Sequence, residues 1–456
     1  MTRITQILTT PVSGAYYFED LHTLQAQPIP VEARYTAPAA APGLKYVREP
    51  SRALAVGLVL NDKHVAWGDC VSVAYSGAGG RDPALDINSA SSLIKDQIAP
   101  LLLEQDPRNF RDLSAKIDQI RIQVTEERIL PERKTGDSIS RRELFQAAGQ
   151  LLANGPRTEK VALEKMLPAA VRYGVSQALF SAAAMVQDLT LTELICREWN
   201  LDIPDRIVPL HAQCGGNRYR GVDKMIIRQV SSLPHALVDN LKEQLGDDAV
   251  ELIRYTRWIK NRIKELGGDN YLPTIHLDLH GGPGKIYNGD LGKILGTLDA
   301  LEKAAAPYPL RIECPVIQET RESQIETLAN LREYIAFRKL QVEIVADEWA
   351  NSLDDIQAFL SGSAADMIQI KMPDLGSLED TIEAVRICRS CGVKTFLGGS
   401  CAETSLSSRI TAQLALAVQP DLVLAKPGMG IDEAVALMQN EMSRELAWLK
   451  QKSKQQ

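Results

Sequence analysis

The chain has 456 residues and a formal net charge of −7 at pH 7, so its length predicts two domains and its acidic balance argues against nucleic acid as the main partner. Hydrophobic residues make up 45% of the chain, and the longest apolar run, residues 53–60, is too short to span a membrane. The opening MTRITQILTTPV lacks a signal peptide's apolar core, and the seven cysteines fit reduced thiols, so we expect a cytoplasmic protein.

The first 70 residues predict β-strands. Residues 53–60 are rich in strand-forming side chains, and a similar run at 64–73 follows a turn-like Asn61-Asp62 pair, which favours an antiparallel hairpin. The glycine-rich YSGAGGRDP comes next, at 75–83. It lacks the Lys-Ser/Thr of a P-loop and the Rossmann spacing, so we favour a flap over a site and keep a phosphate-binding loop as the alternative.

Residues 84–200 are predicted to be mostly helical. Apolar residues recur at spacings of three and four in 89–103 and 111–122, and 169–187 is an alanine-rich segment typical of a closely packed helix. The charged stretch 125–160 is interpreted as an insertion. We place the domain boundary so that residues 1–202 form an N-terminal α+β domain and residues 203–456 a second domain.

From residue 207 the sequence alternates between apolar runs and amphipathic helices. Such a pattern, repeated eight times over about 230 residues, predicts a (β/α)₈ barrel. The predicted strands are 207–212, 223–228, 273–278, 309–314, 341–347, 367–371, 394–399 and 421–426.

Ionisable residues end four consecutive predicted strands: Asp278, Glu313, Asp347 and Lys371. In a (β/α)₈ barrel these strand ends converge on one mouth. Three carboxylates meeting there would repel one another unless a hard divalent cation lay between them, so we predict a Mg²⁺ site. The alternative, that acidic residues end strands by chance or cap the following helix, suits one such residue better than three in succession.

Lys371 is the candidate base, because an ammonium in a dry pocket beside a divalent ion loses its proton more easily. The alternative is a solvated or ion-paired lysine. Gln369 lies on the same face of its strand and can hydrogen-bond a substrate carboxylate. His235 is expected in a loop after Pro234, either as a second acid or base or in a structural role. The segment Gly398-Gly399-Ser400-Cys401 offers N–H groups, a hydroxyl and a thiol, which suit a substrate carboxylate.

These motifs together resemble methylaspartate ammonia-lyase, a family of the enolase superfamily, and the resemblance runs nearly from end to end. It is carried by an ordered set of segments: YSGAGGRDP (75–83), HAQCGGNRY (211–219), VDKMI (222–226), LPHAL (233–237), HLDLHG (276–281), RIECP (311–315), VADEW (345–349), QIKMPDLG (369–376), GGSCAET (398–404), AKPGMG (425–430) and NEM (440–442).

The resemblance implies an N-terminal capping domain on a (β/α)₈ barrel, usually in a homodimer, and Mg²⁺ on the three carboxylates with a monovalent cation such as K⁺ assisting. It implies that Lys371 removes the C3 proton of L-threo-3-methylaspartate to give a metal-stabilised enolate, with His235 on the opposite face. Ammonia then leaves to give mesaconate, a step of amino-acid degradation and glutamate catabolism. It assigns the substrate's polar groups to Gln213, Gln369, Ser400 and Cys401, with His211 beside them.

Several positions differ from the pattern of this family, and they cluster around the predicted substrate: Ala74, His211, Cys214–Asn217, Phe396, Ser400 and Ala402. The predicted metal ligands and Lys371 do not differ. We therefore keep, as alternatives, an enolase-superfamily lyase or dehydratase acting on a different amino or hydroxy diacid, and a non-catalytic protein that retains the barrel. The intact carboxylates and Lys371 argue against the last of these.

Overall fold

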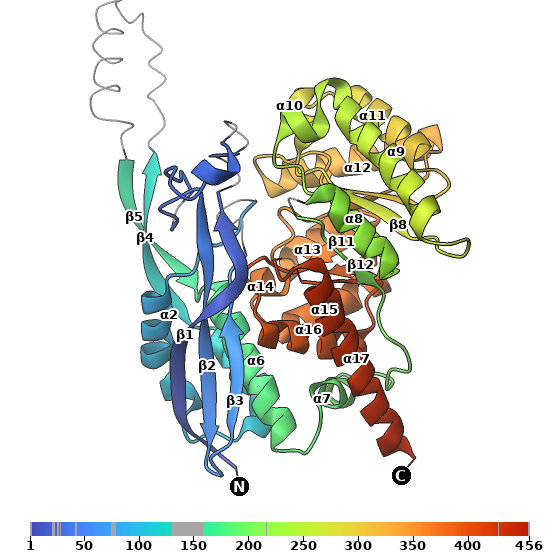
Figure 1. Ribbon diagram of the computed structural model, residues 1–456. Coiled ribbons are helices and arrows are strands. Elements are labelled where there is room, and N and C mark those ends of the chain that lie inside the picture. Colours follow the sequence, from blue (N-terminus) through green and yellow to red (C-terminus); the bar gives the residue numbers. More distant parts are fainter. Residues whose placement is uncertain are drawn as a thin grey trace, which may run out of the picture. The chain divides into compact units, whose positions relative to one another are not determined.

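The computed structural model describes residues 2–20, 23–24, 27, 29–41, 43–73, 79–129, 158–215, 217–426 and 428–454 (Figure 1). Residues 75–78 of the predicted flap and most of the predicted insertion lie outside these ranges, as does Ala74. The chain forms two compact units, one of Met1–Ser114 with Pro168–Gln456 and one of Ala115–Leu167. Within the described residues, no helix is long and apolar enough to cross a membrane.

Eight parallel strands close into a barrel, which confirms the predicted fold class. Their order around the barrel follows the chain, β6 to β13, with β13 pairing β6. The strands are β6 (Leu210–His211), β7 (Ser232–His235), β8 (Thr274–Asp278), β9 (Leu310–Glu313), β10 (Val342–Ala346), β11 (Met367–Ile370), β12 (Lys394–Leu397) and β13 (Leu422–Leu424).

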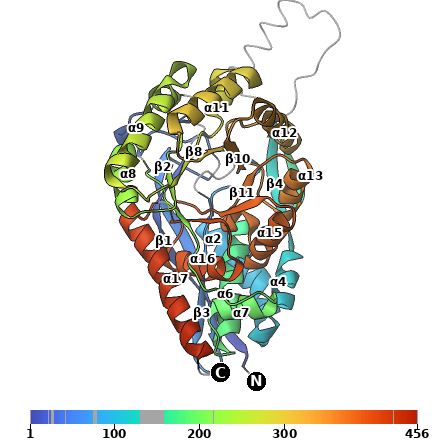
Figure 2. The same ribbon diagram turned by 90° about the vertical axis from the view of Figure 1, so that its right-hand side faces the viewer.

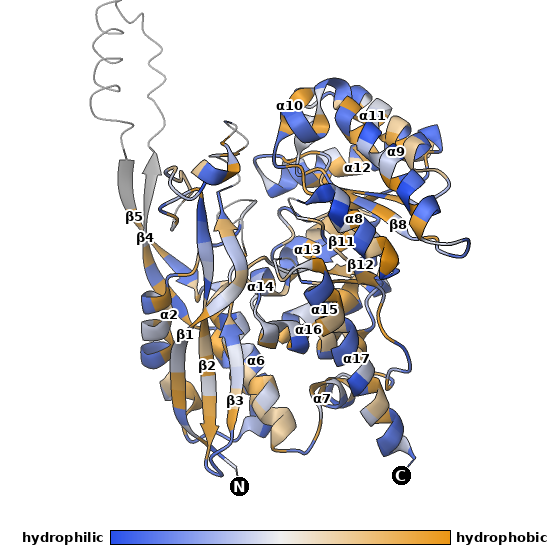
Figure 3. Ribbon diagram, viewed as in Figure 1, coloured by the Kyte–Doolittle hydropathy of each residue, from blue (hydrophilic) through white to orange (hydrophobic). Residues whose placement is uncertain are grey.

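Helices follow the strands and surround the barrel (Figure 2). Helices α9 (Val250–Leu266), α11 (Leu291–Ala305) and α12 (Arg321–Arg338) each combine hydrophilic and hydrophobic residues (Figure 3), and their buried residues include Ile259, Leu298 and Leu328. Ser352 and Ser377 cap the helices that follow them, because each accepts a hydrogen bond from a backbone N–H group three residues later. The helices are α8 (Arg218–Ile227), α9 (Val250–Leu266), α10 (Gly282–Ile286), α11 (Leu291–Ala305), α12 (Arg321–Arg338), α13 (Leu353–Ser361), α14 (Met372–Leu375), α15 (Leu378–Ser390), α16 (Ser405–Val418) and α17 (Ile431–Ser453).

One predicted barrel strand was wrong. Residues 223–227 belong to helix α8, which residue 228 caps, and the second strand of the barrel is β7. Val222, Met225 and Ile226 are all buried, and their spacing of three and four puts them on one helix face, so a short apolar run was ambiguous between the two structures. The correction moves His235 from a loop to the carboxyl end of β7.

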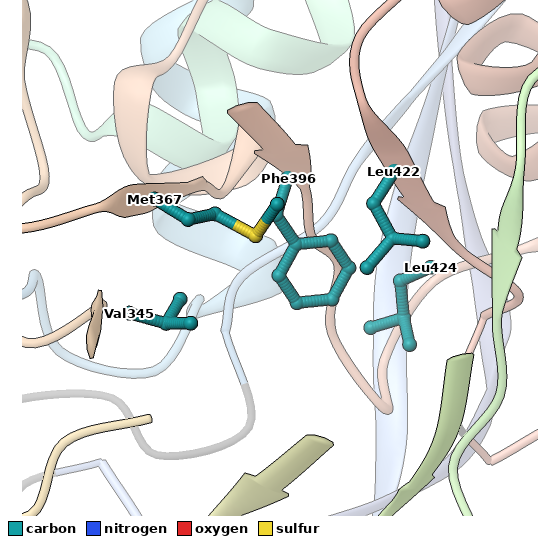
Figure 4. Packing of buried hydrophobic residues seen from close by; sticks show 5 residues of the cluster. All are labelled: Val345, Met367, Phe396, Leu422 and Leu424. Atoms are coloured by element: carbon teal, nitrogen blue, oxygen red, sulfur yellow. The ribbon is translucent and has the colours of Figure 1, made fainter. Parts of the chain in front are cut away.

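Apolar side chains from adjacent strands pack below the mouth of the barrel (Figure 4). The cluster consists of Val345, Met367, Phe396, Leu422 and Leu424, each at most 2% exposed. Side chains alternate along a strand, so Met367, Gln369 and Lys371 share one face of the β11 segment. This face therefore has an apolar residue, Met367, in the buried cluster, and the polar residues Gln369 and Lys371 nearer the mouth.

The N-terminal residues form a three-stranded antiparallel sheet with the predicted hairpin in it. Its strands are β1 (Ile4–Glu19), β2 (Arg48–Leu60) and β3 (Val65–Cys70), and the helices of this region are α2 (Ile87–Leu93), α3 (Ala99–Leu102), α4 (Phe110–Asp118), α6 (Ala169–Met185) and α7 (Leu191–Glu198). Helix α6 packs on β3. A Cβ atom added to Gly68 would lie 2.1 Å from the carbonyl oxygen of Gly174, so this helix approaches the sheet as closely as its small residues predicted.

The second unit contains an antiparallel pair of strands, β4 (Arg121–Ile129) and β5 (Thr158–Met166). The prediction that residues 84–200 are mostly helical was therefore wrong for these two segments. The spacing of charged residues in these segments fits the period of two of a strand as well as the spacing of three and four of a helix. Pairing between the two segments is what makes them strands.

Candidate active site

The four strand-end residues singled out in the sequence come together on adjacent strands of the barrel. Asp278 and Glu313 end β8 and β9 and lie opposite each other in the sheet register, while Asp347 and Lys371 directly follow β10 and β11. All four are at most 8% exposed. The strand order β8–β9–β10–β11 therefore brings three carboxylates and one amine to one buried place.

Hydrogen bonds hold these carboxylates in fixed orientations. His276 Nε2 donates to Glu313 Oε2 at 2.7 Å, and Gln369 Nε2 donates to the other oxygen of Glu313. Lys371 Nζ donates to Asp347 Oδ2 at 2.6 Å, and the backbone N–H of His280 donates to Asp278 Oδ1 at 3.0 Å. Such partners around a metal-binding carboxylate fix which lone pairs remain for an ion.

The electrostatics of this cluster favour a bound cation. Burial, together with the charge of Glu348, raises the pKa of Asp278 to about 7, and burial and Asp278 raise the pKa of Glu313 well above its ordinary value. Carboxylates crowded in this way bind protons or a cation readily, because either one relieves the repulsion. All-oxygen ligands are the set that Mg²⁺ prefers, so the residues present fit this ion.

His235 is closer to the carboxylates than its sequence position suggested. Its Nε2 lies 3.7 Å from Asp278 Oδ2 and 3.9 Å from Glu313 Oε2. In the described part of the chain, possible ligand atoms of these three residues lie within 4.8 Å of one another, whereas Asp347 is engaged by Lys371 and Arg81. Burial and the charge of Lys371 lower the pKa of His235 to about 3, so the imidazole is neutral.

The pKa of Lys371 is raised, contrary to the expectation of an easily lost proton. Burial, the largest influence, and Arg81 both lower this pKa, but the carboxylates of Asp347, Glu348 and Asp374 together outweigh them. The sequence argument assumed a divalent ion on these carboxylates, and an ion there would compete with the ammonium for their charge.

The predicted substrate-binding residues lie around the same mouth. Gln213 and Cys401 line a cavity of about 820 Å³, and Gln213 Nε2 is 3.4 Å from His235 Nδ1. Ser400 Oγ donates to the carbonyl oxygen of Ser72 at 3.0 Å, which ties the segment after β12 to the N-terminal region. Burial raises the pKa of the Cys401 thiol to about 12, which argues against a nucleophilic thiolate.

His211 lies deeper than the other predicted substrate-binding residues. It is fully buried, its Nδ1 is 3.0 Å from Ser232 Oγ, and its ring centroid is 4.6 Å from that of His276 and 5.3 Å from that of Phe396. His211 is not among the described residues that line the cavity. A direct contact between His211 and substrate stays a prediction.

The sequence reasoning missed four charged or ionisable residues of the site. Arg81, Glu348 and Asp374 form a buried ion-pair group with Asp347, and His280 Nδ1 is 3.0 Å from Glu348 Oε1. Signals were present, since Glu348 adjoins Asp347 and Asp374 lies one helical turn after Lys371. Arg81 belongs to the glycine-rich segment that we predicted to be a flap.

Comparison with known proteins gives two matches to family models. The model described as the methylaspartate ammonia-lyase C-terminus matches residues 202–451, and the model for the N-terminus of the same proteins matches residues 2–130 and 138–200. Of the predicted insertion, only residues 131–137 are left out of the matched segments.

Individual relatives agree with the family models over the whole chain. Methylaspartate ammonia-lyase 2 of Carboxydothermus hydrogenoformans is 38% identical over 450 residues, covering 99% of each chain. The crystal structure of Citrobacter amalonaticus methylaspartate ammonia-lyase containing (2S,3S)-3-methylaspartic acid is 35% identical with a TM-score of 0.86, covering 98% of this chain and 100% of that one. A Mg complex of β-methylaspartase from Clostridium tetanomorphum is 34% identical with a TM-score of 0.82, covering 99% and 100%.

Proposed function

Because this chain belongs to the methylaspartate ammonia-lyase family, we propose that it is a Mg²⁺-dependent carbon–nitrogen lyase that eliminates ammonia from 3-methylaspartate to give mesaconate. The observation that carries this function is the buried group of Asp278, Glu313, Asp347 and Lys371 at the carboxyl ends of four adjacent barrel strands. The alternative of a dehydratase acting on a hydroxy diacid is not favoured by the full-length relatives.

Asp278, Glu313 and Asp347 are the proposed ligands of Mg²⁺. When bound, the ion supplies positive charge to the substrate carboxylate whose neighbouring proton is removed. His276 and Gln369 each donate to Glu313, so they orient this carboxylate. His235 also lies within 4 Å of two of these ligands, Asp278 and Glu313, so a charge bound there acts on the imidazole as well.

Lys371 is the proposed base for the C3 proton. Its Nζ is already at the mouth, held by Asp347 Oδ2, and a neutral amine is needed there to accept a proton. Sharing Asp347 with a cation weakens the interaction that stabilises the ammonium, and the positive charge of Arg81 acts in the same direction. His235 is proposed to act on the opposite face of the substrate.

Residues of the surrounding loops are proposed to hold the polar groups of the substrate. Gln213 and Cys401 line the cavity, whereas Gln369 and Ser400 are each only 2% exposed. Gly398 is needed for this arrangement, because a Cβ atom there would lie 2.3 Å from Gln369 Oε1. We extend the proposal to His211 as a substrate-binding residue, because its ring centroid is 5.5 Å from that of His235.

Further features remain part of the proposal. We infer a division at residue 202 into an N-terminal capping domain and a catalytic barrel, an insertion near residues 125–160, and a homodimer in the cytoplasm. A monovalent cation such as K⁺ assists Mg²⁺, and the reaction serves amino-acid degradation, in particular glutamate catabolism.

The test is an ultraviolet assay for mesaconate with purified protein, (2S,3S)-3-methylaspartate and Mg²⁺. The expected result is a steady increase in absorbance that stops on addition of a chelator. Lys371→Gln should lose activity by a factor of about 10² or more while it still binds Mg²⁺. No absorbance change with 3-methylaspartate, but a change with another amino diacid, would contradict the proposed substrate and retain the reaction class.

A further inference from the structure

Arg81 belongs to a short segment fixed onto the loop that follows β10. The carbonyl oxygen of Gly79 accepts hydrogen bonds from the backbone N–H of Trp349 at 3.3 Å and from Asn351 Nδ2 at 2.6 Å. Gly79 and Gly80 have φ of +56° and +80°, and an added Cβ atom would lie 3.1 Å from Glu348 and 3.0 Å from Trp349, respectively. The glycines thus allow the segment to lie directly against the loop that carries Asp347.

The guanidinium of Arg81 enters the site from this segment. Its side chain is 1% exposed, its Nε donates to Asp374 Oδ2 at 2.7 Å, and its Nη2 donates to Asp347 Oδ1 at 3.0 Å. Its Nη1 is buried without a hydrogen-bond partner, 3.8 Å from Glu348 Oε1. A guanidinium suits this place because its planar fork can bind two carboxylates at once.

The two carboxylates that Arg81 joins lie on chain segments that follow neighbouring strands of the barrel. Asp347 follows β10, and Asp374 lies in helix α14, which begins directly after Lys371. The backbone N–H of Asp374 also donates to the carbonyl oxygen of Lys371 at 3.0 Å. Arg81 therefore connects the proposed metal ligand to the turn of chain that carries the proposed base.

We propose that Arg81 is a positioning residue that holds Asp347 toward the metal and Lys371 toward the substrate by bridging Asp347 and Asp374. The bridge leaves one oxygen of Asp347, Oδ2, for the ammonium or the ion. An assembled site therefore requires residues 79–81 to lie against the loop after β10. This inference rests on the proposed function, because it assigns Arg81 a task within that reaction.

The test compares Arg81→Gln and Arg81→Lys with the wild-type chain, using Mg²⁺ alone as the calorimetric probe. Arg81→Gln should weaken Mg²⁺ binding by about 10- to 100-fold, as is usual when a partner of a metal ligand is lost. It should also lower kcat by about 10²-fold through misplacement of Lys371, with a much smaller change in KM. Arg81→Lys should recover part of both losses, because one ammonium cannot reproduce the two-sided bridge.

Arg332→Gln is the matched control. Arg332 pairs with Asp366 at 2.6 Å just before β11, at the end of this strand opposite to Lys371. Its loss removes a partly exposed Arg–Asp ion pair at the far end of the strand, so Mg²⁺ affinity and kcat should stay at wild-type values. Equal losses in Arg332→Gln and Arg81→Gln would show a general structural effect and overturn the proposal.

Other outcomes separate the proposal from the proposed function. If wild-type protein binds Mg²⁺ but releases no ammonia from 3-methylaspartate, the function fails, while the Mg²⁺ titrations still decide the role of Arg81. If Arg81→Gln does not fold, as thermal unfolding would show, Asp374→Asn decides instead, because it removes one half of the bridge and should cause an intermediate loss. Wild-type Mg²⁺ affinity and kcat in Arg81→Gln, or in Asp374→Asn, would refute the positioning role.

Discussion

Lys426 offers a sharp test of how the loop after β12 is held in place. Its Nζ donates to Glu403 Oε1 at 3.1 Å and to the carbonyl oxygen of Gly398 at 3.1 Å, and both side chains of the ion pair are fully buried. An added Cβ atom at Gly399 would lie 2.9 Å from the same Nζ. Lys426 therefore contacts both ends of the segment that carries Ser400 and Cys401.

Lys426→Met should destabilise the protein by about 3 kcal/mol. Removing one partner of a buried ion pair costs about 3–5 kcal/mol, because the other charge is left in a medium that does not solvate it. The lower end applies here, since the hydroxyl of Ser407 still donates to Glu403. Pairing Lys426→Met with Glu403→Gln should recover most of the loss, because no unpaired charge then remains.

Urea denaturation followed by tryptophan fluorescence measures these free energies, with the two single variants and the double variant forming a cycle. The lyase assay on the same variants should show a raised KM in Lys426→Met, because the segment with the proposed substrate-binding residues Ser400 and Cys401 loses its contacts with Lys426. A loss of less than about 1 kcal/mol in Lys426→Met, or a double variant no more stable than the two single effects predict, would refute the reasoning.

Three further predictions concern packing, pH and metal. Gly68→Ala should destabilise by about 1–3 kcal/mol through overpacking, whereas Gly296→Ala, with nothing within 4 Å of an added Cβ atom, should stabilise helix α11; thermal unfolding checks both. Burial raises the pKa of Asp20, but hydrogen bonds from one hydroxyl and three backbone N–H groups outweigh it and lower the pKa overall. The stability advantage of wild type over Asp20→Asn should thus be full above about pH 5 and shrink as the pH falls below about 4 in unfolding curves. Mg²⁺ at about 100 times its Kd should stabilise the wild type by about 2.7 kcal/mol, and Asp278→Asn should lose this shift in thermal unfolding.

The sequence identified the barrel because seven of its eight predicted strands are short apolar runs separated by amphipathic helices, and four of them end in ionisable residues. The remaining predicted strand, residues 223–228, was wrong because its apolar run is short: MII at residues 225–227 fits a helix face as well as a strand. His235 was misplaced with it, from a strand end to a loop. Cross-strand register, which no local pattern encodes, decided both positions.

The hairpin of β4 and β5 failed for a related reason. A long stretch of chain separates its two strands. Charged and apolar side chains do not alternate in them clearly enough to indicate a strand. Pairing between Arg121 and Met166 at one end of the hairpin joins residues 45 positions apart, which propensity alone cannot foresee.

The sequence by itself determined the chemistry of the mouth, because Asp278, Glu313, Asp347 and Lys371 each sit at the end of a strand and a barrel must bring such ends together. Only the tertiary structure decided what surrounds them. Arg81 lies 266 residues before Asp347 in the chain, and its role depends on a glycine segment docking onto a barrel loop. Long-range contacts of this kind depend on how whole elements pack, and no local spacing in the sequence records them.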